Sequence, residues 1–162
     1  MGDYQHHRQP FAPVFDRDSK ILILGTFPSV KSRENNFYYG HPQNRFWKVI
    51  AALWDEPVPQ TVEEKKSLVL RRHLAIWDVI ESCDIIGSSD SSIKNVVPAD
   101  IGGLMDRTKI ERIYVNGNLA KKLYDKFALP VTGMQAIKLP STSPANARFR
   151  LDQLIESWQT IL

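Results

Sequence analysis

The segment from Gly25 to Ile50 contains the residues of this 162-residue chain that are best suited to chemistry on a ligand. It opens at the end of an apolar run, carries the consecutive aromatics Phe37, Tyr38 and Tyr39, and closes in a stretch with basic side chains. Aromatic rings beside positive charge suit a flat ligand that stacks near phosphate groups. The alternative is that these aromatics belong to the hydrophobic core, where most aromatic side chains pack.

Motifs of the common cofactor and metal enzymes are absent from the sequence. It has no Walker phosphate loop, no dinucleotide-binding glycine fingerprint and no nucleophile elbow. Its His and Cys residues lack the spacing of a zinc site. We therefore expect an activity that uses neither a metal nor a nucleotide cofactor. The adjacent His6 and His7 are interpreted as part of a surface segment rather than as metal ligands.

The charge balance permits nucleic-acid binding without requiring it. The chain has 21 Lys and Arg against 18 Asp and Glu, a net charge of +3, and a pI of about 9.0. Basic residues gather in one segment and again after a polar loop: Lys31, Arg33, Arg45 and Lys48, then Arg148 and Arg150. The alternative is ordinary solvated surface charge.

Length and cysteine usage bound the class of protein. A chain of 162 residues fits one domain over residues 1–162, with residues 1–19 as an extended lead-in. The single Cys83 cannot form an internal disulfide, which fits a reducing cytoplasm, with a nucleoid association if the source is bacterial. The sequence has neither a membrane-spanning stretch nor the apolar core of a signal peptide.

Strand-like and helix-like segments alternate along the chain. Four short apolar runs are predicted to be strands: residues 20–25, 75–80, 110–115 and 135–139. Helices are expected to open at 41–44 and to cover 61–73, 99–107, 119–127 and 148–162, the last with Leu151, Leu154, Ile155 and Trp158 facing inward. This order predicts a three-layer α/β/α fold around a short, central, mostly parallel four-stranded sheet. The polar loops 26–39, 116–118 and 141–148 would then meet at the carboxyl ends of the strands, where such folds bind ligands.

Two motifs in this order resemble those of the uracil-DNA glycosylase superfamily. The string His41-Pro-Gln-Asn-Arg-Phe-Trp-Lys-Val-Ile50 is similar to the first motif of mismatch-specific uracil/thymine-DNA glycosylases. The fuller pattern Leu24-Gly-Thr-Phe-Pro-Ser29, followed by Phe37-Tyr-Tyr-Gly40, resembles the hypoxanthine-DNA glycosylase branch more closely. Leu139-Pro-Ser-Thr-Ser-Pro-Ala-Asn146 resembles the second motif in that branch's form. Shorter similarities lie at Trp77-Asp78, Gly87 to Ile93 and Val115-Asn-Gly-Asn118.

The resemblance implies a DNA-repair enzyme that hydrolyses the N-glycosidic bond of a deaminated base. Such an enzyme flips the nucleotide out of the duplex before cleavage. Tyr39 would stack on the flipped base, and the backbone from Gly25 through Thr26 to Phe27 would contact its edge. Asn44 would be the main catalytic residue, positioning the water or the base, because an amide has no pKa suited to a strong general base. The alternative for Asn44 is helix capping.

The second motif implies contacts to DNA. Ser141, Thr142 and Ser143 would bind phosphates, and Lys31 would add a positive charge. Ala145 takes the place where relatives carry a bulky wedge, and a methyl group is a poor plug. Asn146 or Arg148 would fill the gap left by the flipped base.

Further polar residues keep two readings at the sequence level. Asn116 would read the base or serve as a turn residue. Asp78 would touch the site or anchor the loop that follows it. His73 and Cys83 are expected to pack or to lie on the surface.

Two departures from the family pattern favour hypoxanthine over uracil. Phe27 stands where many members carry an Asp or Asn that activates water, and Ser141 where many carry a His that stabilises the leaving base. A purine leaves with less assistance because it can be partly protonated. We therefore expect a monofunctional hypoxanthine glycosylase with weak uracil activity that leaves an abasic site for downstream repair enzymes. The alternatives are a uracil or mismatch glycosylase, a non-catalytic binder of damaged DNA, and a hydrolase of free purine nucleotides.

Overall fold

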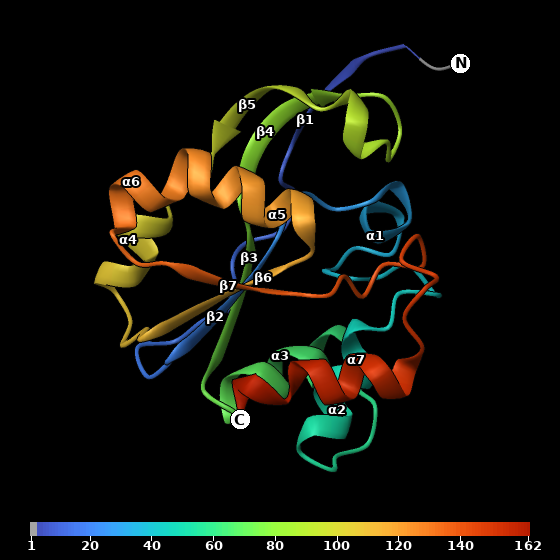
Figure 1. Cartoon of the computed structure of the whole chain (residues 1–162), viewed down its shortest axis with the longest axis vertical. Helices are drawn as coiled ribbons and strands as arrows, with labels where there is room; N and C mark the ends of the chain where they lie inside the picture. The colour runs from blue at the N-terminus through green and yellow to red at the C-terminus, as the bar shows by residue number, and fades with distance from the viewer. Residues whose placement is uncertain (1–2) are drawn as a thin grey trace.

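A four-stranded parallel sheet lies at the centre of the computed structural model, which describes residues 3–162 (Figure 1). Its strands follow the order β3-β2-β6-β7. They are β2 (Ile21–Gly25), β3 (Leu74–Asp78), β6 (Arg112–Asn116) and β7 (Ala136–Leu139), and every neighbouring pair is parallel. These strands lie within two residues of the predicted runs. Short parallel strands buried on both faces explain why each run is almost wholly apolar.

Helices cover both faces of this sheet, as the three-layer prediction requires. One layer contains α2 (Phe46–Leu53), α3 (Val62–Arg71) and α7 (Leu151–Trp158); the other contains α4 (Ile101–Asp106), α5 (Asn118–Leu123) and α6 (Leu129–Thr132). The shorter helical pieces are α1 (Val30–Glu34), the 3₁₀ turns Asp90–Ser92 and Gln159–Ile161, and the π-helical turn Tyr124–Ala128 that joins α5 to α6. Within residues 3–162, no helix is both long enough and apolar enough to cross a bilayer.

The side chains of β2 alternate between two apolar clusters, one on each side of the sheet. Ile21 and Ile23 pack into the cluster formed with α2, α3 and α7. Leu22 and Leu24 pack into the cluster formed with α4 and α5. This alternation follows from the two-residue period of a strand. It fixes the register of β2 and therefore the position of Gly25, where the strand meets the polar loop.

A second, antiparallel sheet flanks the central one, so the predicted single sheet of four strands is incomplete. It has the order β1-β4-β5, with β1 (Gln5–Arg8), β4 (Ile80–Ile85) and β5 (Lys94–Pro98). The expected lead-in 1–19 thus contains a paired strand, although its first two residues lie outside the described part. The sequence of β1, Gln-His-His-Arg, lacks any apolar alternation, so its pairing comes from tertiary contacts.

The final helix is shorter than predicted. It begins at Leu151 rather than at residue 148, and Leu151 is 36% exposed instead of facing inward. Leu154 and Trp158 are buried as expected. The preceding residues form turns that belong to the second-motif loop, so the helical periodicity extended beyond the residues that are helical.

The start of α3 gives a stability prediction that is independent of the site. The Thr61 side chain accepts a hydrogen bond of 3.1 Å from the Glu64 N–H, as the sequence predicts. Thr61→Ala removes this cap and should lower the free energy of unfolding by about 1 kcal/mol in urea titrations. Thr61→Ser keeps the oxygen and is the matched control; equal losses in both variants would contradict the capping role.

Candidate active site

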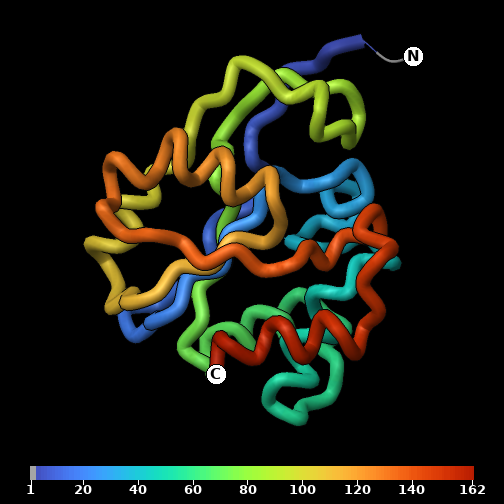
Figure 2. Tube along the Cα trace, viewed as in Figure 1, coloured from blue at the N-terminus to red at the C-terminus, as the bar shows by residue number. Residues whose placement is uncertain are grey.

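A cavity of about 690 Å³ lies at the carboxyl ends of the central strands, where the three predicted loops meet. Figures 1 and 2 show α1 and the segment between β7 and α7 side by side at the right of the molecule. Most of the predicted base-binding and DNA-binding residues line the cavity: Gly25, Thr26, Phe27, Lys31, Tyr39, Asn44, Asp78, Asn116, Ser141, Thr142, Ser143 and Ala145. The predicted convergence of the loops is therefore confirmed. Asn146 and Arg148 lie beyond the cavity lining.

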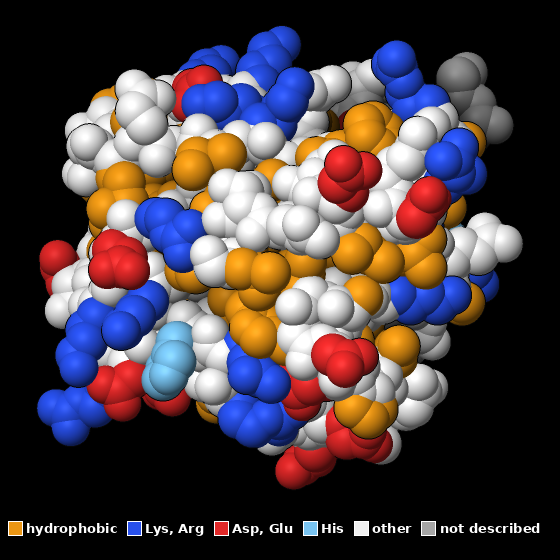
Figure 3. All heavy atoms as spheres, turned by 60° about the horizontal axis from the view of Figure 1, so that its bottom comes forward, with side chains coloured by type: hydrophobic (Ala, Val, Ile, Leu, Met, Phe, Trp, Pro, Cys, Tyr) orange, Lys and Arg blue, Asp and Glu red, His pale blue; other side chains and the backbone are white. Residues whose placement is uncertain are grey.

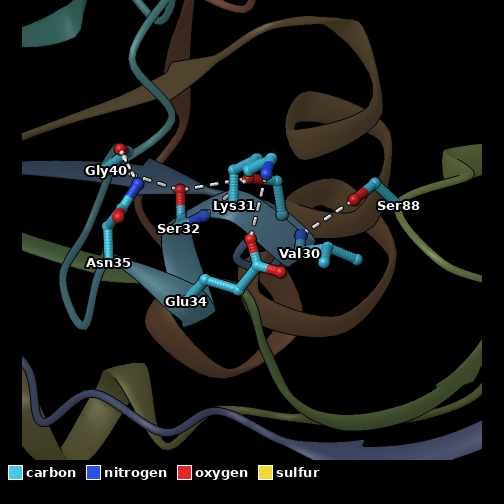
Figure 4. A network of polar contacts seen from close by, with 8 residues as sticks. Val30, Lys31, Ser32, Glu34, Asn35, Gly40 and Ser88 are labelled. Carbon is cyan, nitrogen blue, oxygen red and sulfur yellow. Dashed lines mark hydrogen bonds and ion pairs between the residues drawn. The ribbon is translucent and has the colours of Figure 1, made fainter.

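A network of small polar side chains holds the loop that carries Tyr39 (Figure 4). The Ser32 hydroxyl accepts a hydrogen bond of 3.1 Å from the Gly40 N–H, and Asn35 donates one of 2.7 Å to the Gly40 carbonyl. Ser88, from the 87–92 loop, accepts a hydrogen bond from the Val30 N–H. These contacts keep Tyr39 at a φ of 54°, an unfavourable value for a residue other than glycine. The loop is thus shaped before any ligand arrives.

The three consecutive aromatics separate into core and site. Phe37 and Tyr38 are 4% and 2% exposed and belong to the hydrophobic core. Tyr39 lies at the cavity, and its ring stacks on Phe46 with a centroid distance of 3.9 Å and an interplanar angle of 15°. One face of Tyr39 is therefore occupied, and a flat ligand has only the opposite face for stacking. The core interpretation is right for two of the three rings.

Asn44 combines the two roles that the sequence left open. Its Oδ1 accepts one hydrogen bond from the Phe46 N–H at the start of α2 and another from the Thr142 hydroxyl, each 2.9 Å long. Asn44 also lines the cavity. With both lone pairs of Oδ1 in use, the side chain can offer a ligand only the N–H groups of Nδ2. It can donate to a water molecule or to a base, but it cannot accept a proton from either.

Thr142 connects Asn44 to Asn116. Its hydroxyl accepts a hydrogen bond of 3.0 Å from Asn116 Nδ2, and its N–H donates one of 3.0 Å to Asn116 Oδ1. Thr142 is fully buried. It therefore cannot contact a phosphate directly, as the sequence-based interpretation had expected. It instead fixes the amides of Asn44 and Asn116, which come from different parts of the fold.

Arg45 holds the second-motif loop from inside the protein. Its guanidinium donates hydrogen bonds to the carbonyls of Ser143 (2.9 Å), Asn146 (3.1 Å) and Phe149. Its N–H donates to the Thr142 carbonyl at 3.1 Å. Arg45 was grouped with the basic cluster that would face DNA, but its donors are used within the chain. It is a structural residue that charge alone could not distinguish.

The expected DNA contacts differ in how free their side chains are. Lys31 is exposed and forms an ion pair of 3.3 Å with Glu34. Asn146 donates its amide to the Ser141 carbonyl at 3.0 Å, so it points back into the loop and does not project as a plug. Ala145 and Arg148 are exposed. Among residues 3–162, Arg148 has no side-chain hydrogen bond or ion pair, which leaves it free to reach a partner.

Surface charge is mixed on the side of the molecule that carries α2, α3 and α7. Lys and Arg side chains alternate there with Asp and Glu (Figure 3). The net charge of +3 is therefore not concentrated on this face, and the loops around the cavity carry the basic residues of interest, Lys31 and Arg148. Within the described chain, no three His, Cys, Asp or Glu side chains converge as metal ligands.

Asp78 is the buried carboxyl group of the site. It is 4% exposed, ends β3 and lines the cavity. Burial raises its pKa to about 7, against the opposing effect of hydrogen bonds from Gln9 and the Gly25 backbone. The cavity interpretation of Asp78 is therefore supported over that of a loop anchor.

Several residues near the cavity were not assigned a role from sequence. Gln9 donates a hydrogen bond to Asp78 Oδ2 from the segment expected to be a plain lead-in. His41, Ser88, Asp90 and Ser91 line the cavity as well. The similarity at Gly87 to Ile93 was the one signal that could have identified the serines and Asp90, whereas nothing in the N-terminal sequence marks Gln9.

Comparison with known proteins decides the family. The family model described as the uracil DNA glycosylase superfamily matches residues 12–162. The chain belongs to the uracil DNA glycosylase superfamily. The match includes both motif loops and every strand of the central sheet, so the superfamily's ligand site and the cavity described above coincide in the fold.

Curated relatives and a solved structure agree with this assignment. A protein of Methanosarcina acetivorans named hypoxanthine DNA glycosylase is 33% identical over 156 residues, which cover 95% of this chain and 97% of that relative. One of Methanosarcina barkeri with the same name is 30% identical over 143 residues, covering 87% and 89%. A solution NMR structure of a candidate uracil DNA glycosylase from Methanosarcina acetivorans superposes with a TM-score of 0.79 at 30% identity, covering 97% and 99%.

Thr142→Val tests whether this side chain orients the amides. The substitution keeps the shape but removes the hydroxyl, which leaves Asn44 Oδ1 and Asn116 Nδ2 each short of a buried partner. We expect the free energy of unfolding to fall by ~1–3 kcal/mol and any glycosylase rate to fall more than DNA affinity does. Thr142→Ser, which keeps the hydroxyl, should retain most of the rate. A Val variant with a wild-type rate would contradict the positioning role.

Proposed function

We propose that this protein is a monofunctional DNA glycosylase that removes hypoxanthine from deoxyinosine in DNA and leaves an abasic site. The observation that carries the proposal is the placement of Tyr39 and Asn44 on one cavity at the strand ends, with Asn44 fixed as a hydrogen-bond donor. Membership of the superfamily and the names of two relatives support the same activity. The base enters the cavity only after it has been flipped out of the duplex, since the bond is not accessible within the base stack.

In this proposal Asn44 acts electrostatically on the reaction. Cleavage of the glycosidic bond leaves positive charge on the sugar and negative charge on the departing base. The Nδ2 donors of Asn44 stabilise that negative charge or hold the attacking water by its oxygen. They cannot remove a proton from the water. A sugar that already resembles a cation at bond cleavage needs little activation of the water, so a donor in this position is sufficient.

The two departures from the superfamily pattern support a purine substrate. Phe27 lines the cavity with an apolar ring, and the Arg33 guanidinium lies 5.7 Å from its centroid. Ser141 accepts a hydrogen bond from the Ser143 N–H and carries no charge. Neither side chain supplies the carboxylate or imidazole help that a pyrimidine leaving group requires. Hypoxanthine can accept a proton on its imidazole ring, so it leaves without that help.

A substrate comparison with Asn44→Ala tests the proposed function. Duplexes with one deoxyinosine or one deoxyuridine are incubated with protein, and alkali-sensitive abasic product is measured at single turnover. Wild-type protein should cleave the inosine duplex and leave the uracil duplex nearly intact. Asn44→Ala should lose most of the rate, ~100-fold or more, while its affinity for the duplex stays within a few fold.

Other outcomes of that comparison would identify a different function. Equal rates on both duplexes would indicate a broader glycosylase. Affinity without product, unchanged in Asn44→Ala, would indicate a damage-binding protein. Base release from free deoxyinosine would indicate a nucleoside hydrolase.

Tyr39→Ala tests the stacking role. Removal of the ring should weaken binding of an inosine duplex by ~1–3 kcal/mol, the usual contribution of base–aromatic stacking. Tyr38→Phe is a suitable control, because Tyr38 belongs to the core and its hydroxyl only joins the Phe11 and Ala12 carbonyls. Titrations at two salt concentrations separate stacking from phosphate contacts, since only phosphate contacts weaken as salt rises. Unchanged affinity in Tyr39→Ala would rule out stacking.

The proposed activity also implies a cellular setting. We place the enzyme in the cytoplasm, on nucleoid DNA if the organism is bacterial, because its single thiol, Cys83, is free. Its abasic product requires downstream repair enzymes that cut and refill the strand, and these are its expected functional partners.

A further inference from the structure

Asp78 lies in an unusual environment for a carboxyl group that lines a polar cavity. It ends β3 next to Gly25 of β2, and its side chain is almost completely removed from solvent. No ion pair joins Asp78 to a Lys, Arg or His among the described residues. A buried carboxyl group without a cation is costly to keep charged, so such a group is rarely retained unless it has a function.

The two oxygens of Asp78 have different partners. Gln9 donates to Oδ2, and the Oε1 of Gln9 is itself held by the Phe11 N–H at 2.8 Å, so the amide can present only its N–H groups to Asp78. Oδ2 must therefore be an acceptor, and a proton bound by Asp78 resides on Oδ1. Gln9 thus determines which oxygen carries the proton.

Oδ1 lies where the strand leaves room for it. A Cβ atom on Gly25 would be 2.6 Å from Asp78 Oδ1 and 2.9 Å from the Tyr39 hydroxyl, so the absence of a side chain at Gly25 makes this space. The Tyr39 hydroxyl is itself buried and has no hydrogen-bond partner within the described chain. Gly25, Tyr39 and Asp78 all line the cavity. Oδ1 and the Tyr39 hydroxyl therefore form a polar corner of the base pocket that is unsatisfied without a ligand.

We propose that Asp78 is the general acid of the reaction, delivering a proton from Oδ1 to N7 of the flipped purine as the C1′–N9 bond breaks. This inference rests on the proposed function. The bond electrons remain on the base, which leaves as neutral hypoxanthine protonated on N7. Water adds its oxygen to C1′ and releases one proton to solvent, and solvent restores the proton on Oδ1. Protons and charge therefore balance over one turnover.

The surroundings of Asp78 allow this proton to be present near neutral pH. Burial is the main cause of its raised pKa of about 7, and no charged neighbour contributes. The titratable groups that face it are the phenols of Tyr38 and Tyr39, whose own pKa values are raised, first by burial, so both stay neutral. Asn116 acts in the opposite direction on Tyr39. On the adjoining β4, Glu81 is exposed, and Lys31, His41 and Asp90 line other parts of the same cavity.

The first test is a pH–rate profile of Asp78→Asn at single turnover on an inosine duplex. Wild-type protein should be fastest below pH 7 and slow about 10-fold per pH unit above it, because the acid form is lost. The variant keeps the shape and the hydrogen-bond donor but has no proton to transfer. It should be slower by ~100-fold or more at pH 6, with no falling limb above pH 7.

Two results would overturn the inference. A variant with the wild-type rate and profile removes Asp78 from the chemistry. A variant that keeps the rate but loses the falling limb reduces Asp78 to a hydrogen-bond donor. Both differ from failure of the proposed function, in which wild-type protein releases no hypoxanthine at any pH.

Gln9→Met is the second test, and it does not alter Asp78 itself. Removal of the N–H donor removes a contact that favours the carboxylate, so the pKa of Asp78 should rise further. The falling limb should move to higher pH, with the rate at pH 6 unchanged. Gln5→Met, on the exposed strand β1, is the matched control and should leave the profile unchanged. A rate lowered equally at all pH values would mean that Gln9 is only structural, and would contradict its role in setting the proton.

Discussion

The buried hydroxyl of Thr142 is the interaction on which the site depends. Through one side chain and one backbone N–H it joins the turn before α2, the end of β6 and the second-motif loop. Each of these segments is irregular, and each brings an amide or a backbone group to the cavity. Without a common partner their relative positions would be set only by the flexible loops. With it, Asn44 and Asn116 have fixed orientations, because exchanging O and N on either amide would place like groups against each other.

The same economy is visible on the other side of the cavity, where Asp78 and Tyr39 meet at Gly25. The parallel pairing of β2 with β3 brings residues 25 and 78 into register, and the missing side chain at 25 lets polar atoms from two loops approach. The site therefore has two differently constructed halves. The Asn44 half is fully hydrogen-bonded and rigid, whereas the Asp78 half keeps unsatisfied polar atoms for a ligand. Such a division suits an enzyme that must both orient a base and change its charge.

Sequence reasoning predicted the central sheet because short parallel strands are continuous apolar runs, and 20–25 or 110–115 could hardly be anything else. It located Asn44, Tyr39 and Gly25 through the motif resemblance and the rule that ligands bind at strand ends. It could not find β1 or Gln9, since a polar tetrapeptide pairs only when a neighbouring strand is available. It also assigned Arg45 and Thr142 to DNA because charge and hydroxyl groups look alike in a sequence whether they face inward or outward. Long-range hydrogen bonds, such as Arg45 to residues about 100 positions away, have no local signature.

The clamp that Arg45 forms on the second-motif loop has a consequence for how quickly DNA is searched. A loop that becomes ordered only on contact loses entropy at every encounter, and most encounters in a genome are with undamaged sites. Here the guanidinium already fixes three carbonyls of the loop, so its backbone entropy was lost when the chain folded. The protein can therefore touch and leave a duplex many times without reorganising itself, and the slow event at each site is the extrusion of a nucleotide.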